Sequence, residues 1–124
     1  MVMLTDLILG NCESSSMTEK ATGKKIILTT SGTKEEAEDI AWVLVERKLA
    51  ACVNIVALTS IFRWKDEIES SPEFLLIIKT TAAAFERVRE VIKELNSYEL
   101  PECIQLSIEA GSETYLKWIA DSVE

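Results

Sequence analysis

The sequence predicts an α+β domain of the split βαβ, or ferredoxin-like, class, followed by a short C-terminal helix. Segments with strand-forming and helix-forming patterns occur in the order β-α-β-β-α-β. In this class an antiparallel sheet carries two long helices on one face. The composition, 48% hydrophobic and 27% charged residues, is that of a folded chain. A chain of 124 residues can bury one such core, so we expect residues 24–124 to form the domain and residues 1–23 a flexible extension.

The first strand and helix follow this extension. Residues 24–30, KKIILTT, are rich in β-branched and apolar side chains and precede a Ser-Gly pair, which predicts a strand. Thr33 and Glu36 form a capping box, which predicts the start of a helix. The apolar side chains after it recur at spacings of three and one, as on one buried helix face, and indicate that the helix ends near Lys48.

A long apolar segment and its return predict a β-hairpin. Residues 51–64, ACVNIVALTSIFRW, are long for one strand, and an irregularity at residues 57–60 would let the strand bend. Residues 65–73 read as the turn region. They include Pro72, which lacks the N–H group that a central strand needs. We therefore expect the return strand to start after this proline, at residues 73–81, EFLLIIKTT.

A second helix, a fourth strand and a terminal helix complete the order. The second helix is predicted from Ala82, because apolar side chains recur at spacings of three and four from Phe85. Residues 102–111 alternate apolar and polar side chains, which predicts a strand with an outward polar face. Ser112 is the expected N-cap of the last helix. The side chains expected to face inward there are Tyr115, Leu116, Ile119 and Val123.

Two of the strands are apolar on consecutive residues. A half-solvated antiparallel sheet alternates apolar and polar side chains, whereas residues 24–30 and 73–81 predict a sheet that is dry on both faces. The two helices can cover only one face. The simplest cover for the other face is a second subunit, so we expect an obligate oligomer.

Composition excludes several functional classes. The chain has 21 Asp and Glu against 13 Lys and Arg, a net charge of −8, which makes nucleic acid a poor partner. No run approaches the roughly 20 apolar residues that span a bilayer, so no membrane partner is expected. Three cysteines without CxxC spacing favour a reducing, cytoplasmic location over a disulfide framework. With no His, no Gly-rich phosphate loop and no nucleophile beside a base, we expect a non-enzyme without catalytic residues.

Four motifs, in this order and at these separations, resemble the CutA family of divalent-cation tolerance proteins. They are KLAACVNIV (48–56), TSIFRWKDEIE (59–69), LLIIKTT (75–81) and SYELPE (97–102). The resemblance covers residues 26–123. It implies a homotrimer packed sheet against sheet, a fold like that of the PII signalling proteins, a cytoplasmic location, and association with copper and other divalent cations.

The resemblance also identifies individual positions. Cys52 matches the cysteine of the family's A-A-C-V segment, and Trp64 matches the tryptophan of its Y-x-W-like segment, with phenylalanine in place of tyrosine. Lys79 matches the lysine of its K-T-T segment. Tyr98 and Glu102 match the end of its H-P-Y-x-x-P-E segment, but Asn and Ser replace the His-Pro pair. The early strand has threonine, Thr29, where some members have cysteine. The histidines and early cysteine proposed as copper ligands in some relatives are therefore missing from this chain.

Cys52, Glu99 and Glu102 form the candidate metal site, with no obligatory cofactor and Cu²⁺ as the ion that the resemblance implies. A thiolate ligand needs a second soft or imidazole donor nearby, and carboxylates suit a harder cation. The alternative is that Cys52 is a buried strand thiol and that both glutamates are solvated turn residues.

Trp64, Lys79, Tyr98 and Glu102 form a second candidate site, in a cleft between subunits. Lys79 ends an apolar strand just before two threonines and a helix start, a setting suited to a small anionic ligand. Alternatively, its ammonium group reaches water or pairs with a carboxylate such as Glu102, and the two aromatic side chains serve interface packing.

Three hypotheses follow. The first is a trimeric cytoplasmic protein of divalent-cation tolerance with weak metal binding. The second is a PII-like signalling trimer that binds a small anionic metabolite between subunits. The third is a trimeric scaffold whose function lies in partner contacts, through the extension at residues 1–23.

Overall fold

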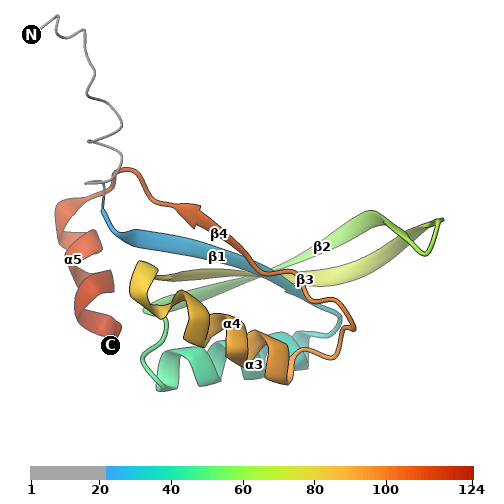
Figure 1. Ribbon diagram of the computed structural model, residues 1–124, viewed down its shortest axis with the longest axis horizontal. Coiled ribbons are helices and arrows are strands. Elements are labelled where there is room, and N and C mark those ends of the chain that lie inside the picture. Colours follow the sequence, from blue (N-terminus) through green and yellow to red (C-terminus); the bar gives the residue numbers. More distant parts are fainter. Residues whose placement is uncertain (1–21) are drawn as a thin grey trace, which may run out of the picture.

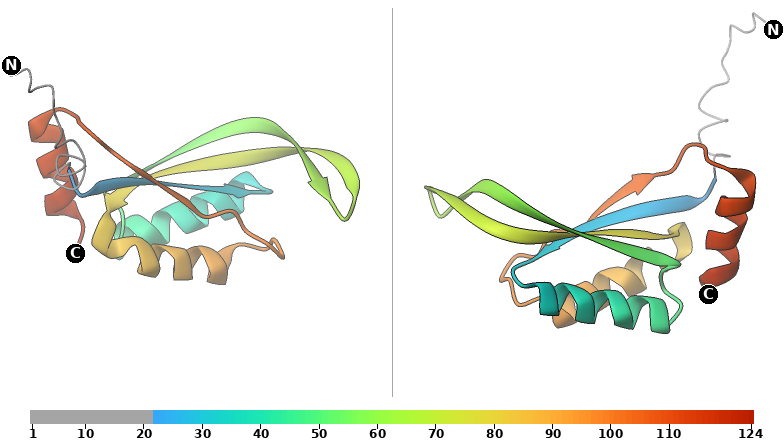
Figure 2. Two further views of the ribbon diagram at one scale, coloured as in Figure 1. Left: turned by 45° about the horizontal axis from the view of Figure 1, so that its top comes forward. Right: turned by 180° about the vertical axis from the view of Figure 1, so that it is seen from behind.

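The computed structural model describes residues 22–124 and has the predicted α+β order (Figure 1). Residues 1–21 of the expected extension lie outside the described residues. The elements are β1 (Lys24–Ser31), α3 (Lys34–Glu46), β2 (Cys52–Trp64), β3 (Glu67–Thr81), the 3₁₀ turn η2 (Ala82–Ala84), α4 (Phe85–Leu95), β4 (Ile104–Ser107) and α5 (Glu113–Ser122). The sheet order is β2-β3-β1-β4, with every neighbouring pair antiparallel. Helices α3 and α4 lie on one face of this sheet (Figure 2). Among the described helices, none is long and apolar enough to cross a membrane.

The Thr33 half of the predicted capping box starts α3, whereas the Glu36 carboxylate accepts hydrogen bonds from Ser31 and Ser97 instead of from the Thr33 N–H. The hydroxyl of Thr33 accepts a hydrogen bond from the backbone N–H of Glu36 at 3.1 Å, which satisfies one free donor of the first turn. Ala37, Ile40 and Leu44, at helical spacing, are completely buried. The apolar pattern therefore predicted correctly which side of α3 faces the sheet.

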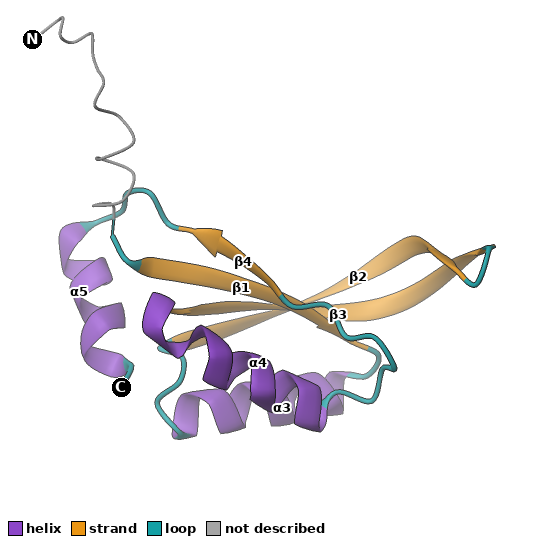
Figure 3. Cartoon of the chain, viewed as in Figure 1, coloured by secondary structure: helices purple, strands orange, loops and turns teal. Residues whose placement is uncertain are grey.

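The hairpin is longer and more regular than the sequence predicted. Strands β2 and β3 pair without interruption, from Cys52 opposite Lys79 to Trp64 opposite Glu67. The prediction of an irregularity at residues 57–60 is therefore wrong. Figure 3 shows the outer half of this hairpin extending beyond the other two strands.

The turn of this hairpin contains only two residues, and the expected nine-residue turn is wrong. Lys65 and Asp66 both have positive φ, at 51° and 66°, as a tight two-residue hairpin turn requires. Pro72 lies inside β3, opposite Thr59. Strand β1 pairs with β3 only from Phe74 onward, so Pro72 lies on a free edge where its missing N–H costs no ladder hydrogen bond.

The core lies between the sheet and the two long helices. Side chains from β1 and β3, including Ile27, Leu76 and Ile78, pack with α3 and α4 side chains such as Ile40 and Ile92. All five have at most 1% of their surface exposed. This layer stabilises the fold, because each fully buried aliphatic side chain contributes about 1.5–3 kcal/mol.

The opposite face of the sheet carries a second apolar layer, here called the open face. In register, Leu28 lies opposite both Ile77 and Ile104, and residues directly opposite one another share a face. The members of the open face are Ile26, Leu28, Val56, Leu75, Ile77, Ile104 and Leu106. Val56, Ile104 and Leu106 are 43–49% exposed. Both faces of the sheet are thus apolar, and α3 and α4 leave the open face uncovered.

The two C-terminal elements depart from the sequence prediction in detail. Strand β4 has four residues, all exposed, instead of the ten expected. Ser112 precedes α5 but makes no side-chain capping hydrogen bond, and Tyr115 is 43% exposed rather than inward-facing. Ile119 is fully buried, as predicted.

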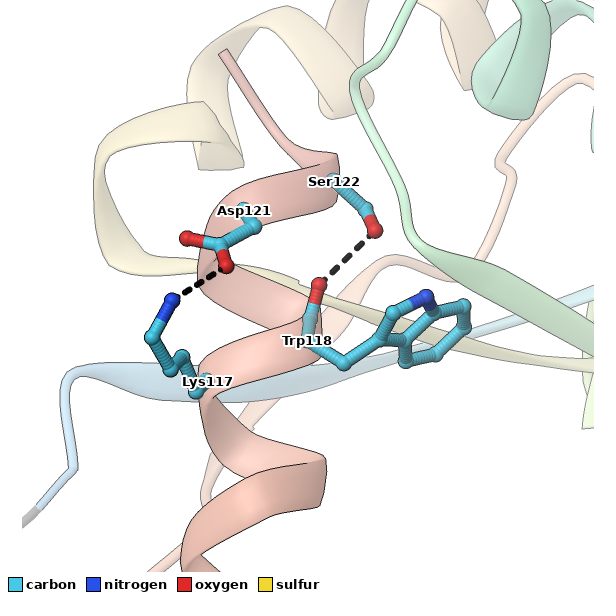
Figure 4. A network of polar contacts seen from close by, with 4 residues as sticks. All are labelled: Lys117, Trp118, Asp121 and Ser122. Carbon is cyan, nitrogen blue, oxygen red and sulfur yellow. Dashed lines mark hydrogen bonds and ion pairs between the residues drawn. The ribbon is translucent and has the colours of Figure 1, made fainter.

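Hydrogen bonds along α5 involve its exposed side (Figure 4). Lys117 donates to the Asp121 carboxylate at 2.7 Å, and the Ser122 hydroxyl donates to the backbone carbonyl of Trp118 at 2.7 Å. The Trp118 ring lies 5.3 Å from that of Tyr115. The tyrosine therefore pairs with a neighbour on its own helix, which explains why the apolar spacing failed to place it in the core.

Thr29→Val is expected to raise the free energy of unfolding by about 1 kcal/mol. The Thr29 side chain is fully buried, and its hydroxyl has no hydrogen-bond partner among the described residues. Valine keeps the shape and removes the unsatisfied group. Urea unfolding at fixed protomer concentration measures the change.

Thr80→Val is the matched control, with the opposite expected sign. Thr80 is equally buried, but its hydroxyl donates to the Leu49 carbonyl at 2.6 Å. Loss of this hydrogen bond in Thr80→Val should lower the free energy of unfolding by about 1 kcal/mol. A loss of stability in both variants would contradict the interpretation of Thr29.

Candidate functional site

The main groove of the molecule, about 790 Å³, lies between the outer β2–β3 hairpin and the loop that joins α4 to β4. Its lining includes the carboxylates Glu69, Glu73, Glu99 and Glu102, and Arg63 is its one cationic residue. The groove therefore has an acidic character. Carboxylate oxygens are the ligands that hard divalent cations prefer.

Tyr98 anchors the loop to the sheet across this groove. Its hydroxyl donates to the Glu73 carboxylate at 2.6 Å, and Glu73 is only 8% exposed. Burial, followed by the hydrogen bond to Glu73 and the charge of that carboxylate, raises the pKa of the Tyr98 hydroxyl far above its ordinary value. The tyrosine therefore stays protonated at neutral pH and remains a hydrogen-bond donor.

The start of the same loop is fixed by buried polar contacts. The Asn96 side chain donates to the backbone carbonyl of Thr30 at 2.8 Å and accepts from the N–H of Tyr98 at 2.9 Å. Glu36, on α3, accepts from the Ser31 hydroxyl at 2.7 Å and from the N–H of Ser97 at 3.2 Å. Asn96, which replaces the histidine of the related motif, therefore has a structural role in this chain.

Gly32 permits the close approach of this loop. A Cβ at position 32 would lie 3.2 Å from the Tyr98 hydroxyl oxygen, closer than ordinary van der Waals contact. A side chain there would force the tyrosine ring, and with it the bond to Glu73, to shift. The glycine after β1 is therefore part of the geometry of the groove.

The negative charge of one groove carboxylate affects the pKa of another. Burial raises the pKa of Glu102 above its ordinary value of 4.5, and the negative charge of Glu73 raises it further. Ionised Glu102 is thus destabilising in the folded chain. A cation bound beside it would relieve this destabilisation.

Glu102→Gln is expected to raise the free energy of unfolding at pH 7, with the gain disappearing as the pH falls below 4.5. Because the folded-state pKa of Glu102 lies above its unfolded value, its contribution to stability is most favourable at low pH. That contribution is lost as the pH rises through the folded pKa. Unfolding by urea across this pH range, with EDTA present, measures the effect.

Glu94→Gln is the control for this pH dependence, because Glu94 is an exposed carboxylate on α4, outside the groove. It should leave the free energy of unfolding nearly unchanged at both ends of the pH range. An equal gain in the two variants would indicate an effect of net charge and not of the groove.

The structure brings some of the predicted site residues together and separates others. Trp64, Tyr98 and Glu102 of the predicted cleft all line the groove. Lys79 lies at the other end of the hairpin, opposite Cys52. Its ammonium nitrogen is 5.8 Å from the centre of the Tyr115 ring.

The predicted metal ligands are divided in the same way. Glu99 and Glu102 line the groove, whereas half-buried Cys52 lies at the far end of β2, with its sulfur 4.0 Å from the Asn54 side-chain oxygen. Within residues 22–124, no cluster of three or more Cys, Asp or Glu is arranged to hold a metal ion. A metal site built from residues 22–124 of one chain would thus have fewer than three such ligands.

Sequence reasoning missed Glu73 and Asn96. In the sequence, Glu73 is only the residue at which the predicted turn meets the return strand, and Asn96 is only a replacement for histidine. The one available signal was that Glu73 is the acidic residue that begins the apolar segment EFLLIIKTT. Its partner Tyr98 is 25 residues away, and local patterns cannot reveal such a contact.

A second groove, about 450 Å³, lies beside α4 and contains Arg89, Lys93 and Cys103. Burial raises the pKa of the Cys103 thiol, and the positive charge of Arg89 opposes this only in part. Cys103 is therefore a thiol and not a thiolate at neutral pH. This groove lacks the carboxylate pair of the main groove.

Comparison with known proteins agrees with the fold and the motifs. The family described as "CutA1 divalent ion tolerance protein" matches residues 25–122. The divalent-cation tolerance protein CutA of Thermus thermophilus is 44% identical over 100 residues, which cover 80% of this chain and 97% of that protein. The corresponding protein of Archaeoglobus fulgidus is 44% identical over 98 residues, covering 79% and 96%.

Solved structures give the same result. The divalent cation tolerance protein of Thermus thermophilus superposes with a TM-score of 0.79 at 43% identity, covering 82% of this chain and 99% of that one. The periplasmic divalent cation tolerance protein CutA of Archaeoglobus fulgidus superposes with a TM-score of 0.80 at 42% identity, with the same coverage. The chain therefore belongs to the CutA1 divalent ion tolerance protein family.

Proposed function

We propose that this chain is a non-catalytic protein of divalent-cation tolerance, copper included, and that its acidic groove binds a divalent cation weakly. Family membership supports the broad role. The observation that carries the binding site is the position of Glu73 and Glu102 in one groove, next to the hydrogen-bonded Tyr98 hydroxyl. The groove offers oxygen donors and no imidazole, so affinity for Cu²⁺ should be modest.

The functional unit is proposed to be a homotrimer. The open face supports this, because its seven apolar side chains lie on the side away from α3 and α4, and three of them are 43–49% exposed in the single chain. Burying apolar surface drives association of subunits. A neighbouring subunit or bound water would also supply further ligands, because residues 22–124 hold no cluster of three or more candidate metal ligands.

The cytoplasm is the proposed location of this protein. The names of relatives differ, since the Archaeoglobus fulgidus structure is described as periplasmic and the Arabidopsis thaliana protein as chloroplastic. Three cysteines without CxxC spacing suit a reducing compartment. Cell fractionation with a specific antibody tests this, and recovery from a periplasmic or organellar fraction would overturn it.

Isothermal titration of the full chain with Cu²⁺ tests the metal site. Because Cu²⁺ can oxidise thiols, titration with Zn²⁺, which has no redox chemistry, is done in parallel. We expect weak binding of both ions that Glu102→Gln reduces and that Glu94→Gln, on α4 outside the groove, leaves unchanged. Equal binding by the two variants would exclude the groove as the site.

The alternative function is that of a PII-like trimer binding a small anionic metabolite, and the position of Lys79 favours it. This lysine makes no ion pair with any described residue, and its ammonium group lies beside Tyr115 at one end of the sheet. The acidic groove would repel an anion, so the ligand is proposed to bind at the Lys79 end and not beside Trp64 and Glu102.

Thermal unfolding with ATP or citrate tests this alternative. Stabilisation that is lost in Lys79→Ala and kept in the control Lys93→Ala, on α4, would support it. No stabilisation by either anion, or equal loss in the two variants, would count against an anion site at Lys79.

A further inference from the structure

The outer face of α3 carries an exposed tryptophan. Trp42 is 74% exposed, although tryptophan is strongly buried on average in folded proteins. Val45, three residues along the same helix, is 42% exposed, and the two side chains are neighbours on the helix surface. On the opposite side of α3, Ile40 and Leu44 are completely buried. The core of this chain therefore does not use Trp42.

Carboxylates surround this apolar pair. Glu38 and Glu46 lie four residues before and after Trp42, which places them one turn away on the same face. Asp39 and Glu35 flank the same face, and all four acidic residues are exposed. The single cation of the helix is Lys34, whose ammonium group is already held by Glu38 at 3.3 Å. The surface formed by Trp42, Val45 and the four carboxylates is here called the Trp42 face.

The Trp42 face is separate from the surfaces already described. Helix α3 lies on the side of the sheet opposite the open face (Figure 2), so association through the open face leaves Trp42 accessible. Neither groove includes an α3 residue. A second copy of the same face is a poor occupant, because the two sets of carboxylates would repel each other.

We propose that the Trp42 face docks a basic amphipathic segment of a partner protein. Lysine or arginine side chains of the partner would pair with the carboxylates and stack on the indole ring, while its apolar side chains would cover Trp42 and Val45. An apolar centre within a polar rim is the general anatomy of a protein interface, and tryptophan is enriched among the residues that dominate binding energy. The same acidic ring disfavours anionic lipid surfaces and nucleic acid.

A labelled synthetic helical peptide tests the proposal. It carries leucines on one face and lysines beside them, and its binding to the full chain is measured by fluorescence anisotropy at physiological salt. We expect Trp42→Ala to weaken binding by about tenfold or more. Glu38→Gln combined with Glu46→Gln should weaken binding and flatten its dependence on salt. Trp118→Ala, which removes an exposed tryptophan of α5, is the matched control and should have no effect.

Two further probes separate the proposal from its alternatives. A peptide with alanines in place of the leucines should bind far more weakly, and a peptide with glutamates in place of the lysines should not bind. Equal binding of the alanine peptide would indicate attraction by charge alone and would overturn the proposal. Equal binding by Trp42→Ala, or binding of phosphatidylcholine vesicles that depends on Trp42, would also overturn it. Circular dichroism of each variant checks that the exposed substitutions leave the fold intact.

Discussion

Replacing Ile77 by glutamate is expected to convert the proposed trimer into monomers. Ile77 lies on the open face in the middle of β3, opposite Leu28 on one side and Asn54 on the other. In a trimer packed through this face, each subunit would bury one new carboxylate beside Leu28, and an ion pair with Lys79, two residues further along the same face, would not offset its desolvation. Removing a carboxylate from water costs several kcal/mol per group, and the trimer would carry this cost in all three subunits. Sedimentation equilibrium measures the oligomeric state.

Trp42→Glu is the matched control, because it places the same charge on the opposite side of the sheet, on the exposed face of α3. That variant should sediment as the wild-type protein does. A trimeric Ile77→Glu variant would mean that the open face is not the interface. A monomeric wild-type protein would contradict the proposed trimer itself.

Local pattern was sufficient to predict the layers of this fold. The N-cap hydrogen bond between Thr33 and the N–H of Glu36 forms because it joins residues three apart in the same turn. Adjacent side chains of a strand point to opposite faces, so the apolar pair Ile26 and Ile27 indicates two apolar faces without any knowledge of the rest of the chain. The uncovered open face is the structural counterpart of that prediction.

Strand limits depended on neighbours that the sequence does not reveal. Whether Pro72 can lie within a strand depends on whether another strand pairs with its N–H side. Strand β1 stops pairing at Phe74, so that edge is free. Strand β3 can therefore continue through Pro72, because no third strand needs a hydrogen bond from that position.

The candidate site was predictable in part. Trp64 of one motif and Tyr98 and Glu102 of another line one groove of the single chain, whereas the sequence prediction placed them in a cleft between subunits. Lys79 does not lie there, and hairpin geometry explains why, since Trp64 is next to the turn while Lys79 is at the open end. Antiparallel pairing alone separates these two residues by the length of the hairpin. Glu73 was not predictable, because its role depends on a hydrogen bond to a distant loop.

Leu76→Ala is expected to lower the free energy of unfolding by about 3 kcal/mol. Leu76 is completely buried in β3, opposite Thr29 of β1 and Ile55 of β2, on the face that the helices cover. Truncation removes apolar contacts and leaves a cavity that a sheet hydrogen-bonded on both sides can close only in part. Because the stability of an oligomer depends on protomer concentration, urea unfolding is measured in the Ile77→Glu background, where the chain is expected to be monomeric.

Leu75→Ala in the same background is the sharpest comparison, because it deletes the same atoms one residue away on the open face. Leu75 is only half-buried in the single chain, so its truncation should cost clearly less than that of Leu76. In the wild-type background the difference between the losses of unfolding free energy in the two variants should become smaller, since trimer packing would bury Leu75 as well. Equal losses in the monomeric background would mean that the two faces of the sheet are packed alike. An unchanged cost of Leu75→Ala between the two backgrounds would mean that no subunit covers the open face.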